Sequence, residues 1–91
     1  MEITEEDKFR VQLGFEIRNI REKMGITQEQ LGECLRIDSA YISKIERGIK
    51  PIPLQSLFEI FAFCGEESVN ELLINIINKV KDYDCYNGKN W

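Results

Sequence analysis

Residues 25–50, GITQEQLGECLRIDSAYISKIERGIK, contain a closely spaced series of helix-start and helix-stop residues, and this spacing restricts the fold more than any other feature. Thr27 and Gln30 form the pattern of a capping box, which predicts a helix over residues 28–35. Asp38 is a favourable N-cap and Gly48 a favourable stop, so another helix is expected over residues 39–47. Two short helices joined by a turn are therefore predicted here.

Apolar residues on both sides of this pair recur at helical spacing. The stretch before it has apolar residues at steps of three or four and predicts a helix over residues 8–24. Beyond the two prolines of IKPIP, the pattern predicts helices over residues 53–64 and 66–81. Residues 1–7 are interpreted as an acidic N-terminal segment and residues 82–91 as a flexible tail. The expected fold is all-α, with five helices and no strand.

The chain of 91 residues is short for the amount of apolar surface on its last two predicted helices. A domain of this size buries only about 60–65% of its unfolded surface, and large exposed apolar patches usually mark interfaces. We therefore expect a homodimer, although both apolar faces could instead close a single core. The expected interface consists of Phe58, Phe61, Val69, Leu72, Leu73 and Ile76.

Catalysis and metal binding have little support in the sequence. The chain has no histidine, and Cys34, Cys64 and Cys85 form no CxxC pair. No glycine-rich phosphate loop and no nucleophile paired with a base is visible. The prediction is a protein that is not an enzyme and that has no cofactor, metal or small-molecule ligand. The acidic N-terminus and the lack of a membrane-length apolar run predict a cytoplasmic protein with reduced thiols.

The formal charge of −4 is unevenly distributed along the chain. Residues 8–50 carry nine basic and six acidic side chains, whereas residues 51–91 carry three basic and six acidic ones. Exposed charges more than about 8–10 Å apart are largely screened at physiological salt, so one face can be basic on an acidic protein. We hypothesise that the acidic residues 2, 5, 6 and 7 oppose loose association with a polyanion, although acidic ends could merely keep the protein soluble.

The stretch IRNIREKMGITQEQLGECLRIDSAYISKIERGIKPIPLQSLFEIFAF resembles the Cro/repressor-type, or Xre-type, helix-turn-helix domains. The resemblance covers roughly residues 13–64 and rests on GITQEQL, on YISKIERG and on the spacing of Ile17, Arg18 and Arg21. It implies a compact five-helix, lambda-repressor-like domain that binds double-stranded DNA and regulates transcription. The acidic start, IDSAYIS and the final helix also look like controller proteins of restriction-modification systems.

The resemblance implies that the helix over residues 39–47 enters the major groove and that helix 28–35 spans the backbone. The DNA-facing positions would be Gln28, Ser39, Ala40, Tyr41, Ser43, Lys44, Arg47 and Lys50. Lys44 is the first candidate for a base contact, and Gln28, Arg47 and Lys50 are candidates for phosphate contacts. Ser39 could equally cap its helix, and the Tyr41 ring could instead cover the edge of the core.

Other positions in the motif are expected to be structural or weaker contacts. Glu46 would pair with a basic residue such as Arg21, and Arg18 and Arg36 would be secondary phosphate contacts. Gly32 and Arg36 depart from the family pattern, which usually has alanine and glycine there. At position 32 both residues are small enough for a close approach of the two helices, whereas at position 36 arginine implies a strained positive φ or a different turn.

The leading interpretation is a homodimer that reads a palindromic operator. A second interpretation is a protein-interaction module, such as an antitoxin or antirepressor, that keeps the helix-turn-helix fold. The short side chains of Ser39 and Ala40 and the net negative charge favour this alternative, whereas the basic excess of residues 8–50 and the intact YISKIERG favour DNA binding.

Overall fold

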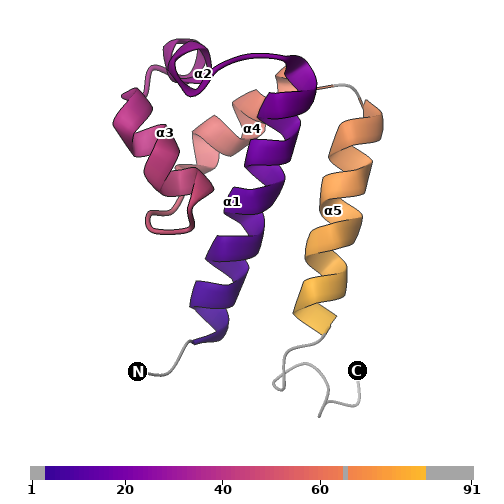
Figure 1. The fold of residues 1–91 in the computed structure, drawn as a ribbon. Coiled ribbons are helices and arrows are strands. Elements are labelled where there is room, and N and C mark those ends of the chain that lie inside the picture. The colour runs from indigo at the N-terminus through magenta and orange to yellow at the C-terminus, as the bar shows by residue number, and fades with distance from the viewer. Residues whose placement is uncertain (1–3, 65, 82–91) are drawn as a thin grey trace.

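The computed structural model describes residues 4–64 and 66–81 (Figure 1). They form five helices, α1 (Glu5–Met24), α2 (Gln28–Leu35), α3 (Ser39–Glu46), α4 (Leu54–Phe63) and α5 (Glu66–Lys81). These two ranges contain no strand, so the all-α prediction is confirmed. The predicted flexible tail over residues 82–91 lies outside the described residues.

Helix α1 begins three residues earlier than periodicity predicted, because a capping box forms at its start. The Thr4 hydroxyl accepts from the Asp7 backbone N–H at 3.0 Å, and the Asp7 carboxylate accepts from the Thr4 N–H at 3.2 Å. Glu5, Glu6 and Asp7 therefore form the first helical turn, where negative charge interacts favourably with the helix dipole. From Glu5 onward, the acidic stretch is part of α1 and not a separate segment.

The other helix boundaries agree closely with the local signals. Thr27 and Gln30 form the predicted capping box, with bonds of 2.9 and 3.0 Å, and Asp38 caps α3 through the Ala40 N–H at 2.8 Å. Gly25 ends α1 with a positive φ of 72°. Helix α4 is one residue shorter than predicted at each end, with Pro53 at its N-cap position.

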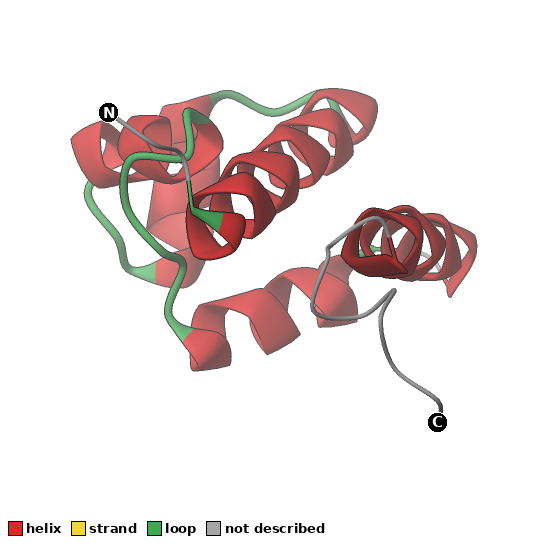
Figure 2. Cartoon of the chain, turned by 90° about the horizontal axis from the view of Figure 1, so that it is seen from below, coloured by secondary structure: helices red, strands yellow, loops and turns green. Residues whose placement is uncertain are grey.

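The helices enclose one apolar core. Its buried members come from all five helices and are Ile17, Ile20, Leu31, Leu35, Ile42, Ile45, Ile60 and Leu72. Helix α3 packs against α1 and α2, and α5 packs beside α1 with the chain running in the opposite direction (Figure 1). Viewed from below, α4 leads from the side of α2 and α3 across to α5 (Figure 2). This packing fixes the two short helices relative to the long α1.

Two glycines allow close backbone approaches. A Cβ on Gly14 would lie 2.3 Å from the Ile45 carbonyl oxygen, so a side chain there would push α1 away from α3. A Cβ on Gly32 would lie 2.4 Å from the carbonyl oxygen of Ile37, in the turn after α2. The expectation that alanine, like glycine, is small enough for position 32 is therefore wrong, because this turn brings a carbonyl against the helix.

The predicted dimer residues differ in accessibility within the single chain. Leu72 is only 3% exposed and belongs to the core, because its side of α5 faces α1; it cannot form part of an exposed face. Phe61 and Ile76 are half-buried and pack against the core, and Val69 is also half-buried. Phe58 is 61% exposed and Leu73 is 42% exposed. Only Phe58 and Leu73 of the six predicted residues are therefore exposed, and the exposed apolar side chains of α4 and α5 also include Leu54, Phe63, Ile74 and Ile77.

Candidate nucleic-acid interface

A tight turn joins α2 to α3 and sets their relative orientation. Arg36 ends α2 in the left-handed conformation, with φ of 59°, and the Ile37 N–H donates to the Gly32 carbonyl at 2.8 Å. Of the two alternatives for arginine at position 36, a positive φ or a different turn, the structure has the positive φ. Asp38 then caps α3, so the turn leads directly into the first residues of that helix. Ala40, in this first turn, is exposed.

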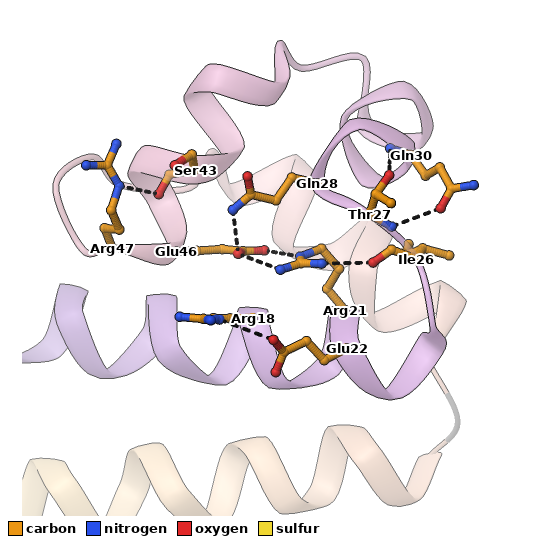
Figure 3. A network of polar contacts seen from close by, with 10 residues as sticks. All are labelled: Arg18, Arg21, Glu22, Ile26, Thr27, Gln28, Gln30, Ser43, Glu46 and Arg47. Atoms are coloured by element: carbon orange, nitrogen blue, oxygen red, sulfur yellow. Dashed lines mark hydrogen bonds and ion pairs between the residues drawn. The ribbon is translucent and has the colours of Figure 1, made fainter.

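A buried polar network fixes α3 to the other two helices (Figure 3). Glu46 accepts from Arg21 through Nε at 2.6 Å and Nη2 at 3.1 Å, and from the Gln28 amide at 3.0 Å. Arg21 also donates to the Ile26 carbonyl at 2.8 Å. The hydrogen bonds that Arg21 donates to Glu46 raise the pKa of the Arg21 guanidinium despite its partial burial. The predicted pairing of Glu46 with Arg21 is confirmed, and it connects α1, α2 and α3.

The eight predicted DNA-facing residues fall into two groups by accessibility. Ala40, Lys44, Arg47 and Lys50 are exposed, whereas Gln28, Ser39, Tyr41 and Ser43 are half-buried. The Tyr41 hydroxyl donates to the Pro51 carbonyl at 3.2 Å, which holds the ring against the loop after α3. The half-buried residues therefore have structural partners or limited access, while the exposed ones are available to a ligand.

The exposed cations follow α3 and the loop that leaves it. The Lys44 and Lys50 ammonium groups have no ion pair with any described residue. Arg47 donates Nε to the Ser43 carbonyl at 3.3 Å, and its remaining N–H groups extend from the end of α3 (Figure 3). Three cations available along one helix and its loop can bind successive phosphates or base edges of a nucleic acid.

The two weaker phosphate candidates, Arg18 and Arg36, are in ion pairs, and the Cys64 thiol is partly buried. Arg18 pairs with Glu22 at 3.3 Å on the surface of α1, and Arg36 pairs with Glu59 at 2.8 Å. Burial raises the pKa of the Cys64 thiol, so it is a weak nucleophile at neutral pH. Within the described ranges, no cluster of side chains has the composition of a metal site, and no helix is long and apolar enough to cross a membrane.

Sequence reasoning missed one contact that shapes this surface. Arg10 of α1 donates Nε to the Gly48 carbonyl at 2.8 Å and Nη2 to the Asp7 carboxylate. The T-x-x-D pattern of residues 4–7 could have located the capping aspartate, but no local signal links α1 to a loop 38 residues away.

Five helices, with a tightly joined α2–α3 pair and exposed cations along α3, define a DNA-binding helix-turn-helix domain. A comparison with family models agrees, because residues 17–72 match the helix-turn-helix model. The chain therefore belongs to the Xre-type helix-turn-helix family of DNA-binding transcription regulators.

Solved structures of regulators are similar to this chain in both sequence and fold. The clp gene regulator ClgR from Corynebacterium glutamicum is 31% identical, with a TM-score of 0.65 over 77% of this chain and 73% of that one. The wild-type restriction-modification controller protein C.Esp1396I is 29% identical, with a TM-score of 0.64 over 77% of this chain and 95% of that one. A comparison with curated protein sequences gave no match.

Proposed function

We propose that the protein is a cytoplasmic, homodimeric transcription regulator that reads a two-fold-related DNA site with α3 in the major groove. The observation that carries the proposal is the set of exposed cations Lys44, Arg47 and Lys50, which lie along α3 and the loop that follows it. Helix α3 is the one that this family uses to read DNA. Bound over a promoter, such a dimer would repress by excluding polymerase. Similarity to a controller protein supports a role in a restriction-modification system.

The proposed base contacts lie along the exposed side of α3. Lys44 donates to guanine O6 or N7, and the Ala40 methyl group contacts a thymine methyl. Ser39 and Ser43 are half-buried, and their short hydroxyl side chains would bond only to base edges that lie close to α3. Because these side chains are short, Lys44 carries most of the sequence discrimination.

Phosphate contacts would flank α3 on both sides. Arg47 and Lys50 bind the backbone near its end, and Gln28 at the start of α2 places an amide beside a helix N-terminus, which favours an anion. Glu46 already accepts from one N–H of the Gln28 amide, so a phosphate would accept from the other. Tyr41 acts mainly by holding the loop after α3.

The exposed apolar side chains of α4 and α5 support the dimer. The centre of the proposed interface is exposed Phe58 on α4 and exposed Leu73 on α5, and exposed Ile77 extends it. At its margin lie the half-buried side chains of Phe61, Val69 and Ile76. A Phe58→Glu variant should sediment as a monomer at micromolar concentration. Phe15→Glu is the matched control, because Phe15 is 54% exposed on α1. Equal dimerisation by both variants and the parent protein would reject this interface.

Selection from a random pool of duplex DNA at about 150 mM salt tests DNA recognition. The protein should enrich a site with two half-sites centred about 34 Å apart, one helical turn of DNA. Lys44→Ala should relax the selected sequence, while Lys79→Ala, an exposed lysine on α5, should not. No enrichment would reject the regulator and favour a module that binds another protein.

A further inference from the structure

Arg10 connects the first turn of α1 to the loop that carries two of the proposed phosphate contacts. Its Nε donates to the Gly48 carbonyl at 2.8 Å, between Arg47 and Lys50 in the chain. Its Nη2 donates to the Asp7 carboxylate, one turn earlier in α1. A planar guanidinium held at two points has a defined orientation, so Asp7 directs the Nε–H of Arg10 toward the loop.

The loop has a conformation that needs such support. Gly48 adopts a positive φ of 76°, and a Cβ there would lie 2.7 Å from Val11 of α1. The N–H groups of residues 49 and 50 donate to the Lys44 carbonyl at 2.9 and 3.3 Å. The end of α3 therefore holds one side of the loop and Arg10 holds the other. The direction in which Lys50 leaves the loop depends on both attachments.

We propose that Asp7 and Arg10 are positioning residues for DNA binding, which hold the loop over residues 47–50 so that Arg47 and Lys50 meet phosphates. This inference rests on the proposed function. Under this proposal the negative charge of Asp7 strengthens specific DNA binding, whereas the other acidic residues near the start of the chain weaken it by repelling phosphates. Removing the charge of Asp7 should therefore weaken DNA binding if Asp7 positions the loop, and strengthen it if Asp7 only repels DNA.

Two charge-matched variants test this sign. Asp7→Asn and Glu6→Gln each remove one negative charge from the same helical turn, but only Asp7 holds Arg10. Glu6 and Lys50 both line an apolar pocket of about 280 Å³. We expect Asp7→Asn to weaken binding to the selected site about fivefold, the effect of losing one oriented hydrogen bond, and Glu6→Gln to leave binding equal or tighter.

Two further measurements separate positioning from loss of helix stability. Thr4→Ala removes the hydroxyl half of the same capping box but leaves the Asp7–Arg10 contact, so it should lower Tm and keep DNA affinity. Lys50→Gln should lower the slope of log Kd against log salt concentration by about one per subunit, because one phosphate contact is lost. In a Lys50→Gln background, Asp7→Asn should then weaken binding by less than it does in the parent protein, because one of the two phosphate contacts that the loop positions is gone.

The outcomes distinguish this inference from the function on which it rests. Asp7→Asn binding as tightly as Glu6→Gln, or Thr4→Ala losing as much affinity as Asp7→Asn, would overturn the positioning role alone. An undiminished effect of Asp7→Asn in the Lys50→Gln background would overturn it as well. A parent protein that selects no DNA site would overturn the proposed function, and the positioning role with it.

Discussion

Replacing Glu46 with alanine should be the most destabilising polar substitution in the described part of the chain. The Glu46 carboxylate is 2% exposed and accepts three hydrogen bonds, two from Arg21 and one from Gln28. The Arg21 side chain is 12% exposed, so its charge would remain largely buried after the partner is removed. Leaving a buried charge without its partner is the costly part of breaking such a pair.

The magnitude follows from this burial and from the remaining partners of Arg21. Breaking a buried ion pair by removing one partner costs about 3–5 kcal/mol. We expect about 3 kcal/mol, because the bond from Arg21 to the Ile26 carbonyl remains and its partial exposure admits water. A 91-residue domain has a total stability of about 5–14 kcal/mol, and this loss corresponds to a fall in Tm of about 12–24 °C.

Urea unfolding followed by circular dichroism at 222 nm measures this loss directly. Glu33→Ala, which removes an exposed acid from α2, is the control and should change stability by less than about 0.5 kcal/mol. Replacing Arg21 and Glu46 together with methionine and leucine should cost less than the two single losses combined, since no unpaired charge remains. A Glu46→Ala variant within about 1 kcal/mol of the parent protein would refute the argument from burial.

Three other predictions use different parts of the structure. Gly14→Ala should lower unfolding free energy by about 1–3 kcal/mol, because its Cβ would lie 2.3 Å from an α3 carbonyl; stabilisation in urea unfolding would contradict this. In a Cys85→Ser variant, iodoacetamide should modify exposed Cys34 before Cys64, whose thiol pKa is raised by burial; mass spectrometry of timed samples would show the reverse order if this is wrong. Hydrogen bonds from Thr4 and Arg10 lower the pKa of Asp7 below its ordinary value of 3.8. The ionised Asp7 carboxylate therefore stabilises the fold above that pH, and this stabilisation is lost as the carboxylate is protonated at lower pH. The difference in Tm between the parent protein and Asp7→Asn should therefore shrink as pH falls below 3.8, and a constant difference would contradict the assignment.

Local signals located most helix boundaries correctly because capping acts between residues three or four apart. Thr27 and Asp38 each have the predicted capping role. The start of α1 was missed because the periodic apolar residues begin only at Phe9, while the hydrogen bonds that extend the helix come from Thr4 and its partner Asp7. A polar first turn leaves no mark in hydrophobic periodicity.

Long-range contacts account for the remaining differences. The periodic pattern identified the apolar face of α5 but not which of its residues would meet α1, so Leu72 was assigned to an interface and lies in the core. Glycine and alanine were both interpreted as small enough for position 32, whereas the Ile37 carbonyl decides what fits beside it. The half-buried state of Tyr41 depends on the path of the loop to Pro51.

The sequence by itself determined the five helices, the α2–α3 pair and the family, because caps, periodicity and motif spacing are properties of neighbouring residues. The pairing of Arg21 with Glu46, which are 25 residues apart, was implied by the resemblance to the family and is made possible by the packing of α1 against α3. Only the tertiary structure decided which apolar residues remain exposed and which side chain holds the loop after α3. Arg10 and Gly48 are 38 residues apart, and their contact exists because α1 packs against α3 closely enough for a guanidinium to reach a backbone carbonyl. Such a contact depends on the packing of whole helices, which no local pattern specifies.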